Sequence, residues 1–126
     1  MALAAVTADA YAADFAECNP AGTQLELNAC AADDFEIADK ELNEVYSELL
    51  RVRGDDEVFV QKMRTAQKAW IAFRDAELEA LFACADSNPR ICWGSMYPMS
   101  YLSEKARLTR ERTQALRTIL REGLER

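Results

Sequence analysis

The sequence contains no histidine, so it lacks both the commonest general base and the usual zinc ligand. Glycine and proline are also scarce, with 4 and 3 among 126 residues. This scarcity argues against a disordered chain and against a turn-rich β-sandwich. No apolar run has the length of a membrane span. Half of the residues are hydrophobic, which suits one small domain with a modest core.

Basic residues are outnumbered, with 15 Lys and Arg against 22 Asp and Glu, giving a net charge of -7. Such a charge disfavours nucleic acid and anionic membrane surfaces as partners. The acids are concentrated between Asp14 and Glu57, whereas the segment from Glu104 to Arg126 is mildly basic. An acidic surface of this kind suits a cationic protein partner, although solubility alone also explains it.

The N-terminal stretch MALAAVTADAYAADF resembles the end of an export signal, because it is small and apolar and contains an A-x-A pattern at Ala10 to Ala12. It lacks a basic start, so we expect the precursor to begin further upstream. We expect residues 1–13 to be a signal-peptide remnant or a disordered tail and residues 14–126 to form a single domain. The four cysteines suit an oxidising compartment, which predicts a periplasmic or secreted protein.

Three segments have helical periodicity. The first runs from Thr23 toward Arg53, because TQLE is a capping-box pattern and RGDDE supplies a glycine stop and an aspartate cap. The second runs from about Asp56 to Ala85, and the third begins between Ser95 and Pro98 and continues to about Arg121. Short connections between long helices predict an all-α, three-helix up-down-up bundle. The expected inward faces are Phe35, Leu42, Tyr46 and Leu49; Phe59, Met63, Ala66, Trp70, Phe73, Leu81 and Cys84; and Leu102, Ala106, Thr109, Leu116 and Leu120.

Each of these inward faces also carries polar residues, which should find one another because an unpaired buried charge is costly. We expect Arg74 to pair with Asp39, and Arg112 with Glu77 or Asp39, since the planar guanidinium can grip a carboxylate in two places. This structural network would fix the register of the helices. Its expected members are Asn28, Asp39, Gln67, Arg74, Glu77, Thr109 and Arg112.

An enzymatic interpretation would use Asp39 and Glu77 as a carboxylate pair acting on a glycoside. The neighbouring arginines would hold both acids ionised, and no glycine-rich pocket loop accompanies them. The four cysteines lack any C-x-x-C spacing that would suggest zinc. We therefore expect no enzymatic activity, no cofactor and no metal.

Five stretches, in order along the chain, form a pattern that covers most of it. They are TQLELNAC (Thr23 to Cys30), ADKELNEVYSELL (Ala38 to Leu50), AQKAWIAFRDAE (Ala66 to Glu77), GSMYPM (Gly94 to Met99) and LTRERTQAL (Leu108 to Leu116). Together they resemble the LprI-like lysozyme inhibitor family. The resemblance implies an all-α, disulfide-bonded envelope protein, with lysozyme inhibition shown for some relatives. It carries over no inhibitory residues, because the family has no agreed inhibitory motif to match.

The cysteines depart from the family pattern, because Leu78 and Glu104 stand where relatives often have cysteine. Four cysteines allow three pairings, so the connectivity stays open. Proximity in the sequence favours Cys18–Cys30 and Cys84–Cys92 as structural disulfides.

The resulting hypothesis is a periplasmic or secreted inhibitor of a cationic cell-wall hydrolase, a lysozyme, that acts by protein–protein binding. In the turn before the third helix, Arg90 and Trp93 are binding candidates, although Trp93 equally suits a plug between helix ends. The other candidates form an acidic stripe on the first helix, which otherwise is an ordinary solvated face. The alternative is an envelope protein-interaction module or adaptor with no hydrolase target. The stripe consists of Asp33, Asp34, Glu36, Glu41, Glu44 and Glu48.

Overall fold

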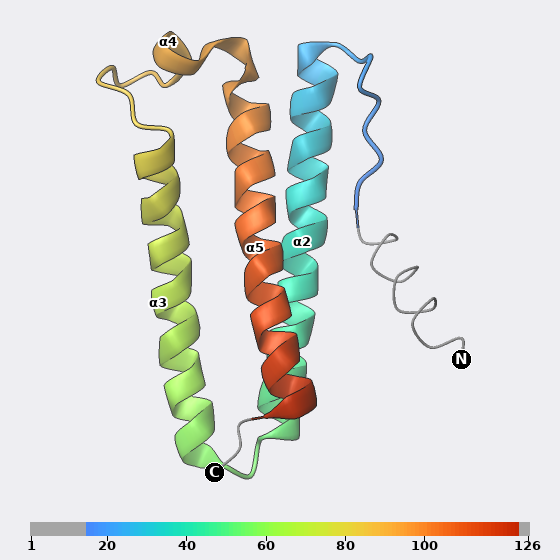
Figure 1. Cartoon of the computed structure of the whole chain (residues 1–126), viewed down its shortest axis with the longest axis vertical. Helices are drawn as coiled ribbons and strands as arrows, with labels where there is room; N and C mark the ends of the chain where they lie inside the picture. The colour runs from blue at the N-terminus through green and yellow to red at the C-terminus, as the bar shows by residue number, and fades with distance from the viewer. Residues whose placement is uncertain (1–14, 124–126) are drawn as a thin grey trace.

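The structure, a computed structural model, describes residues 15–123 and confirms the expected all-α bundle. Its long helices run alternately down, up and down in Figure 1, so α2 and α5 are parallel to each other and antiparallel to α3. The expected signal remnant, residues 1–13, lies outside the described residues. The elements are α2 (Gln24–Val52), α3 (Glu57–Leu81), a short helix α4 (Arg90–Trp93), a 3₁₀ turn η1 (Gly94–Met96) and α5 (Tyr97–Glu122).

The start of α2 is the capping box expected from TQLE. The Glu26 backbone N–H donates to Thr23 Oγ1 over 3.2 Å, and the Thr23 N–H donates to Glu26 Oε1 over 3.2 Å. Asp56 caps α3 by accepting the N–H of Phe59 over 3.1 Å. The helix α2 ends at Val52 with Arg53 as its C-cap, directly before the glycine expected to stop it, although Gly54 is not among the described residues with positive φ.

The predicted end of α3 is wrong, because the helix ends at Leu81 rather than at Ala85. Phe82 leaves the helix, and its ring packs edge-on against Trp93 with the ring centroids 5.2 Å apart. The chain therefore turns four residues early. The start of α5 agrees with the prediction, with Pro98 in its first turn.

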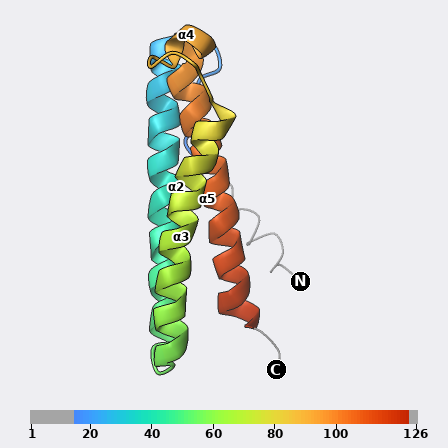
Figure 2. The same cartoon turned by 90° about the vertical axis from the view of Figure 1, so that its left-hand side faces the viewer.

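The parallel helices α2 and α5 pack closely over much of their length and diverge toward the end of α5 (Figure 2), whereas α3 stands further from α5 (Figure 1). Ala38 and Ala106 are almost fully buried, and their small side chains allow the two backbones to approach. Leu42, Leu49 and Leu116 fill the core between them. None of the helices in residues 15–123 is both long and apolar enough to cross a bilayer.

The inward face of α3 agrees with the expectation in part. Phe73 and Leu81, expected inward, are 63% and 48% exposed, and Ala66 is exposed as well. The buried residues are Leu78 and two of the polar residues expected to face inward, Gln67 and Arg74. The helix turns this polar stripe inward because its side chains are long enough to reach partners on α5, which the next section describes.

Candidate protein-binding surface

The buried polar side chains join α3 to α5, but with different partners from those expected. Arg74 Nη1 donates to Thr109 Oγ1 over 3.2 Å, and its Nε bonds to Asp75 Oδ1 over 3.0 Å. Arg112 Nε donates to Gln67 Oε1 over 2.9 Å. The expected ion pairs of Arg74 with Asp39, and of Arg112 with Glu77 or Asp39, are therefore wrong.

Aromatic rings extend this network to α2. The Arg74 guanidinium lies 5.2 Å from the Trp70 ring centroid and 5.8 Å from that of Phe35, which belongs to α2. Lys105 of α5 approaches the same Phe35 ring to 4.7 Å. Burial lowers the pKa of Arg112 from its ordinary value. Around Phe35, the three helices thus meet through contacts between cations and aromatic rings.

Three expected network members lie elsewhere. Asn28 donates to the Ser95 carbonyl over 3.4 Å and so ties the start of α2 to η1. Asp39 accepts a long hydrogen bond of 3.5 Å from Asn43 on its own helix. Glu77 is half-buried on α3.

The acidic stripe of α2 is divided between two faces. Asp34 forms a two-pronged ion pair with Arg110 of α5, with both Nη–Oδ distances at 2.8 Å, and its Oδ1 also accepts the Ala16 N–H over 3.0 Å. The Arg110 hydrogen bonds lower the pKa of Asp34, against the opposing effect of burial. Glu41 also pairs with α5, with its Oε1 lying 3.5 Å from Nη1 of Arg117.

Sequence reasoning missed these two pairs, although both helices carry a signal for them. Asp34 and Glu41 are seven residues apart on α2, and Arg110 and Arg117 are seven apart on α5. Parallel helices bring such repeats into register. Of the remaining stripe residues, Glu48 pairs with Arg51 on α2 at 2.9 Å. The exposed acids are Asp33, Glu36 and Glu44.

Residues 83–93, which we call the loop end, form a braced loop between α3 and α5. The Cys84–Cys92 disulfide closes it, and Cys18–Cys30 ties the N-terminal segment to α2, so both pairs are those favoured by proximity in the sequence. Asp86 Oδ1 accepts the Asn88 N–H over 2.8 Å, and Asn88 Oδ1 accepts the Arg90 N–H over 3.1 Å. The disulfide and these hydrogen bonds fix the conformation of the loop, although the loop contains no long helix.

Both binding candidates in the turn lie on this loop end. The Arg90 side chain is exposed, and the neighbouring Ile91 is 68% exposed. Trp93 donates its indole N–H to the Phe82 carbonyl over 3.2 Å and is still 39% exposed. Trp93 therefore closes the end of α3, as the plug interpretation expects, and also presents part of its ring outward.

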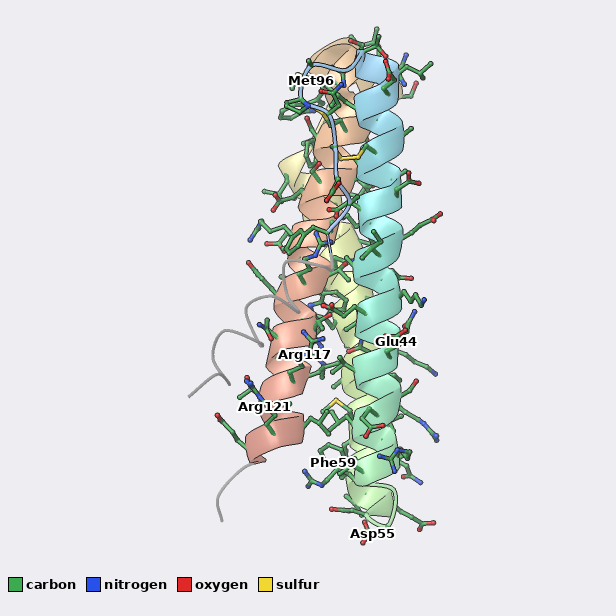
Figure 3. The ribbon with its side chains drawn as sticks, turned by 90° about the vertical axis from the view of Figure 1, so that its right-hand side faces the viewer. Glu44, Asp55, Phe59, Met96, Arg117 and Arg121 are labelled. Carbon is green, nitrogen blue, oxygen red and sulfur yellow. A yellow bond between two sulfur atoms is a disulfide. The ribbon has the colours of Figure 1, made fainter. Side chains whose placement is uncertain are left out.

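Two apolar residues near this end of the bundle were not anticipated. Leu25, in the first turn of α2, is 80% exposed, and Met96 of η1 is 48% exposed. Figure 3 shows Met96 at the opposite end of the bundle from Asp55. Single exposed apolar residues are unremarkable, but together with Ile91 they give this end a partly apolar surface.

These features define a small, disulfide-bonded helical protein whose most distinctive surface is a braced loop at one end of the bundle. The sequence model of the family described as "Lysozyme inhibitor LprI" matches residues 16–116, and the chain belongs to this family. It is also 34% identical over 115 residues to an uncharacterised protein of Rhizobium meliloti (strain 1021), covering 82% of this chain and 78% of that protein. No solved structure matches the chain.

Proposed function

We propose that this protein is an exported inhibitor of a cationic cell-wall hydrolase, a lysozyme, and that the loop end enters the catalytic cleft of the enzyme. Membership of the lysozyme inhibitor family supports the target class. The two disulfides suit an oxidising compartment outside the cytosol. The observation that carries the proposal is the disulfide-closed loop, whose short helix α4 exposes Arg90 and Ile91.

The chemistry of the loop end suits the active site of a glycosidase. Most enzymes of that class place two carboxyl groups on either side of the scissile bond. The exposed guanidinium of Arg90 offers a charged, planar donor fork for such carboxylates, and Ile91 beside it offers apolar contact. Because the disulfide and the Asp86 and Asn88 hydrogen bonds hold the loop, binding loses little conformational entropy.

The net charge of -7 gives the protein a second means of recognising a basic enzyme. Asp33, Glu36 and Glu44 remain exposed on α2 and contribute to long-range attraction. Asp34 and Glu41 already pair with arginines of α5, so we assign them to the fold rather than to the contact surface.

The test is a cell-wall lysis assay in which the oxidised protein is titrated against a panel of lysozyme types. We expect stoichiometric inhibition of at least one type, and Arg90→Ala should weaken that inhibition about tenfold or more, as truncation of an interface anchor does. Arg64→Ala, which removes an exposed arginine from the side of α3, is the matched control and should inhibit like wild type. Full lysis with every enzyme type would refute the proposal.

The second candidate, an adaptor without a hydrolase target, is favoured by the outward side chains of α3. Val58 and Phe73 are 68% and 63% exposed, which is unusual for large apolar residues on one helix. A partner docked there would bind through apolar contact. Phe73→Ser would then abolish its binding, whereas inhibition through the loop end would be unaffected.

A further inference from the structure

A hollow of about 380 Å³ lies beside the loop end, between the end of α3 and the start of α5. Its size falls in the range of small-ligand sites, about 300–1,000 Å³. We call it the tyrosine hollow. The lining residues that matter to its chemistry are Leu78, Glu79, Phe82, Asp86, Tyr97 and Tyr101.

Three aromatic rings form one wall of the tyrosine hollow. The ring centroid of Phe82 lies 6.0 Å from that of Tyr97 and 5.7 Å from that of Tyr101, and the two tyrosine rings are 5.6 Å apart. The faces of such rings carry negative partial charge and attract cations, and clustered rings of this kind are the usual site for alkylammonium groups.

The charged residues that line the hollow are both acids. Glu79 is contributed by α3 and Asp86 by the loop end, and within residues 15–123 no lysine or arginine joins the lining. Burial raises the pKa of Tyr101, and the negative charges of Glu79 and Asp75 raise it further, against a smaller opposite effect of Arg74. The tyrosine hollow therefore has a negative electrostatic potential as well as an aromatic wall.

The walls of the tyrosine hollow are fixed in place. Cys84, which also lines it, is bonded to Cys92, and the Trp93 indole holds the Phe82 carbonyl over 3.2 Å. Leu78 at its base is fully buried. A preformed site of this kind needs no rearrangement to accept a ligand.

We infer that the tyrosine hollow binds an organic cation, an alkylammonium or guanidinium group, and that in the inhibited complex this group is a lysine or arginine side chain of the hydrolase. This assignment to a hydrolase side chain rests on the proposed function. The cationic group of the ligand packs against the faces of the aromatic rings, and Glu79 and Asp86 form ion pairs with that group. The loop end and the tyrosine hollow would then grip the enzyme side by side.

The first experiment uses small probes and needs no partner. The aromatic NMR signals of Tyr97 and Tyr101 are followed while N-acetyl-arginine amide or N-acetyl-lysine amide is added, with neutral N-acetyl-norleucine amide as the matched control. We expect saturable shifts with the cations and little response to norleucine. Glu79→Gln should weaken cation binding about threefold to tenfold, and Tyr101→Leu more than Tyr101→Phe, which keeps the ring. Equal shifts with the neutral probe, or no effect of Glu79→Gln, would overturn the inference.

The second experiment asks whether the ligand is the side chain of the partner or a free cation. With an inhibited lysozyme in hand, Glu79→Gln should raise the Kd of the complex about tenfold, whereas Asp55→Asn at the opposite end of the bundle should change it less than about twofold (Figure 3). Excess arginine probe should also weaken the complex. A probe that binds the tyrosine hollow without weakening the complex would overturn the assignment to the partner. If no hydrolase is inhibited, the proposed function fails and the probe experiment alone decides the cation site.

Discussion

Single side chains decide which acids of α2 remain available to a partner. Asp33 and Asp34 are adjacent in the sequence, yet Asp33 is exposed and Asp34 is held by Arg110 and by the Ala16 N–H. The guanidinium carbon of Arg110 lies 3.9 Å from the ring centroid of Phe15, so the N-terminal segment lies over the Asp34–Arg110 ion pair. The ion pair therefore joins α2, α5 and residues 15–16 at one point.

Asp34→Asn tests this contribution at the residue scale. At neutral pH it should lower the free energy of unfolding by about 1–3 kcal/mol, because it weakens a largely desolvated pair. The ion pair lowers the pKa of Asp34 in the folded protein, so its stabilising effect is present above the ordinary carboxyl pKa of 3.8 and is lost as the pH falls through the lowered value. The difference in unfolding free energy between wild type and Asp34→Asn should therefore become smaller in that acid range.

Chemical unfolding at a series of pH values measures both effects. Asp33→Asn is the matched control and should stay within about 0.5 kcal/mol of wild type, as exposed substitutions usually do. If Asp33→Asn and Asp34→Asn destabilise the protein equally, the ion pair has no special role.

At the scale of the elements, the caps and starts of the helices were largely predictable, whereas the pairings that orient α3 were not. Thr23 and Asp56 cap their helices through bonds within a few residues, and such local bonds leave a readable pattern. The orientation of α3 depends instead on Thr109 and Arg112, which lie far away in the chain. The sequence placed Gln67 and Arg74 on the inward face, but it did not give the pairings of Arg74 with Thr109 and of Gln67 with Arg112. Phe73, which apolar periodicity placed inward, is exposed.

The candidate site likewise combines features that nearby residues predict with features that depend on the fold. The disulfides and the position of Arg90 follow from nearby residues, so the sequence indicated them. The tyrosine hollow brings Phe82 of one helix end to Tyr97 and Tyr101 of another, and only the turn geometry puts these rings together. The division of the acidic stripe likewise depends on the register of α2 against α5, which no single helix specifies.

Arg74→Ala tests what holds α3 to the other two helices. Its side chain is 7% exposed and contacts Thr109, Trp70 and Phe35, so truncation should cost about 2–3 kcal/mol of unfolding free energy through lost packing and ring contact. Arg64→Ala on the exposed side of the same helix is the control. Hydrogen exchange should show protection lost mainly in α3. Uniform loss over all three helices would argue against Arg74 as the specific anchor.

At the scale of the whole molecule, the proposed function assigns an encounter with a basic protein to the charge and to one end of the bundle. The net charge is -7, and the loop end lies where α3 passes into α5 (Figure 1). Met96 of η1 and the lining of the tyrosine hollow belong to the same part of the chain. In the proposed complex, attraction over distance and contact at close range would be functions of different surfaces.

This arrangement predicts how the complex responds to salt. Raising ionic strength from about 0.01 M to about 0.15 M shortens the Debye length from about 30 Å to about 8 Å, so the association rate constant should fall severalfold. The dissociation rate constant should change much less. Surface plasmon resonance with an inhibited lysozyme measures both. An association rate indifferent to salt would instead favour the apolar face of α3 as the contact surface.

The central claim is that the loop end occupies the catalytic cleft, and competition with a cell-wall oligosaccharide tests it most directly. The Kd of the complex is measured by calorimetry with the hydrolase free and with its cleft saturated by a short, non-hydrolysed oligosaccharide. The account predicts that the oligosaccharide raises the apparent Kd in proportion to its own occupancy. An unchanged Kd, with the oligosaccharide and the inhibitor bound together, would contradict it.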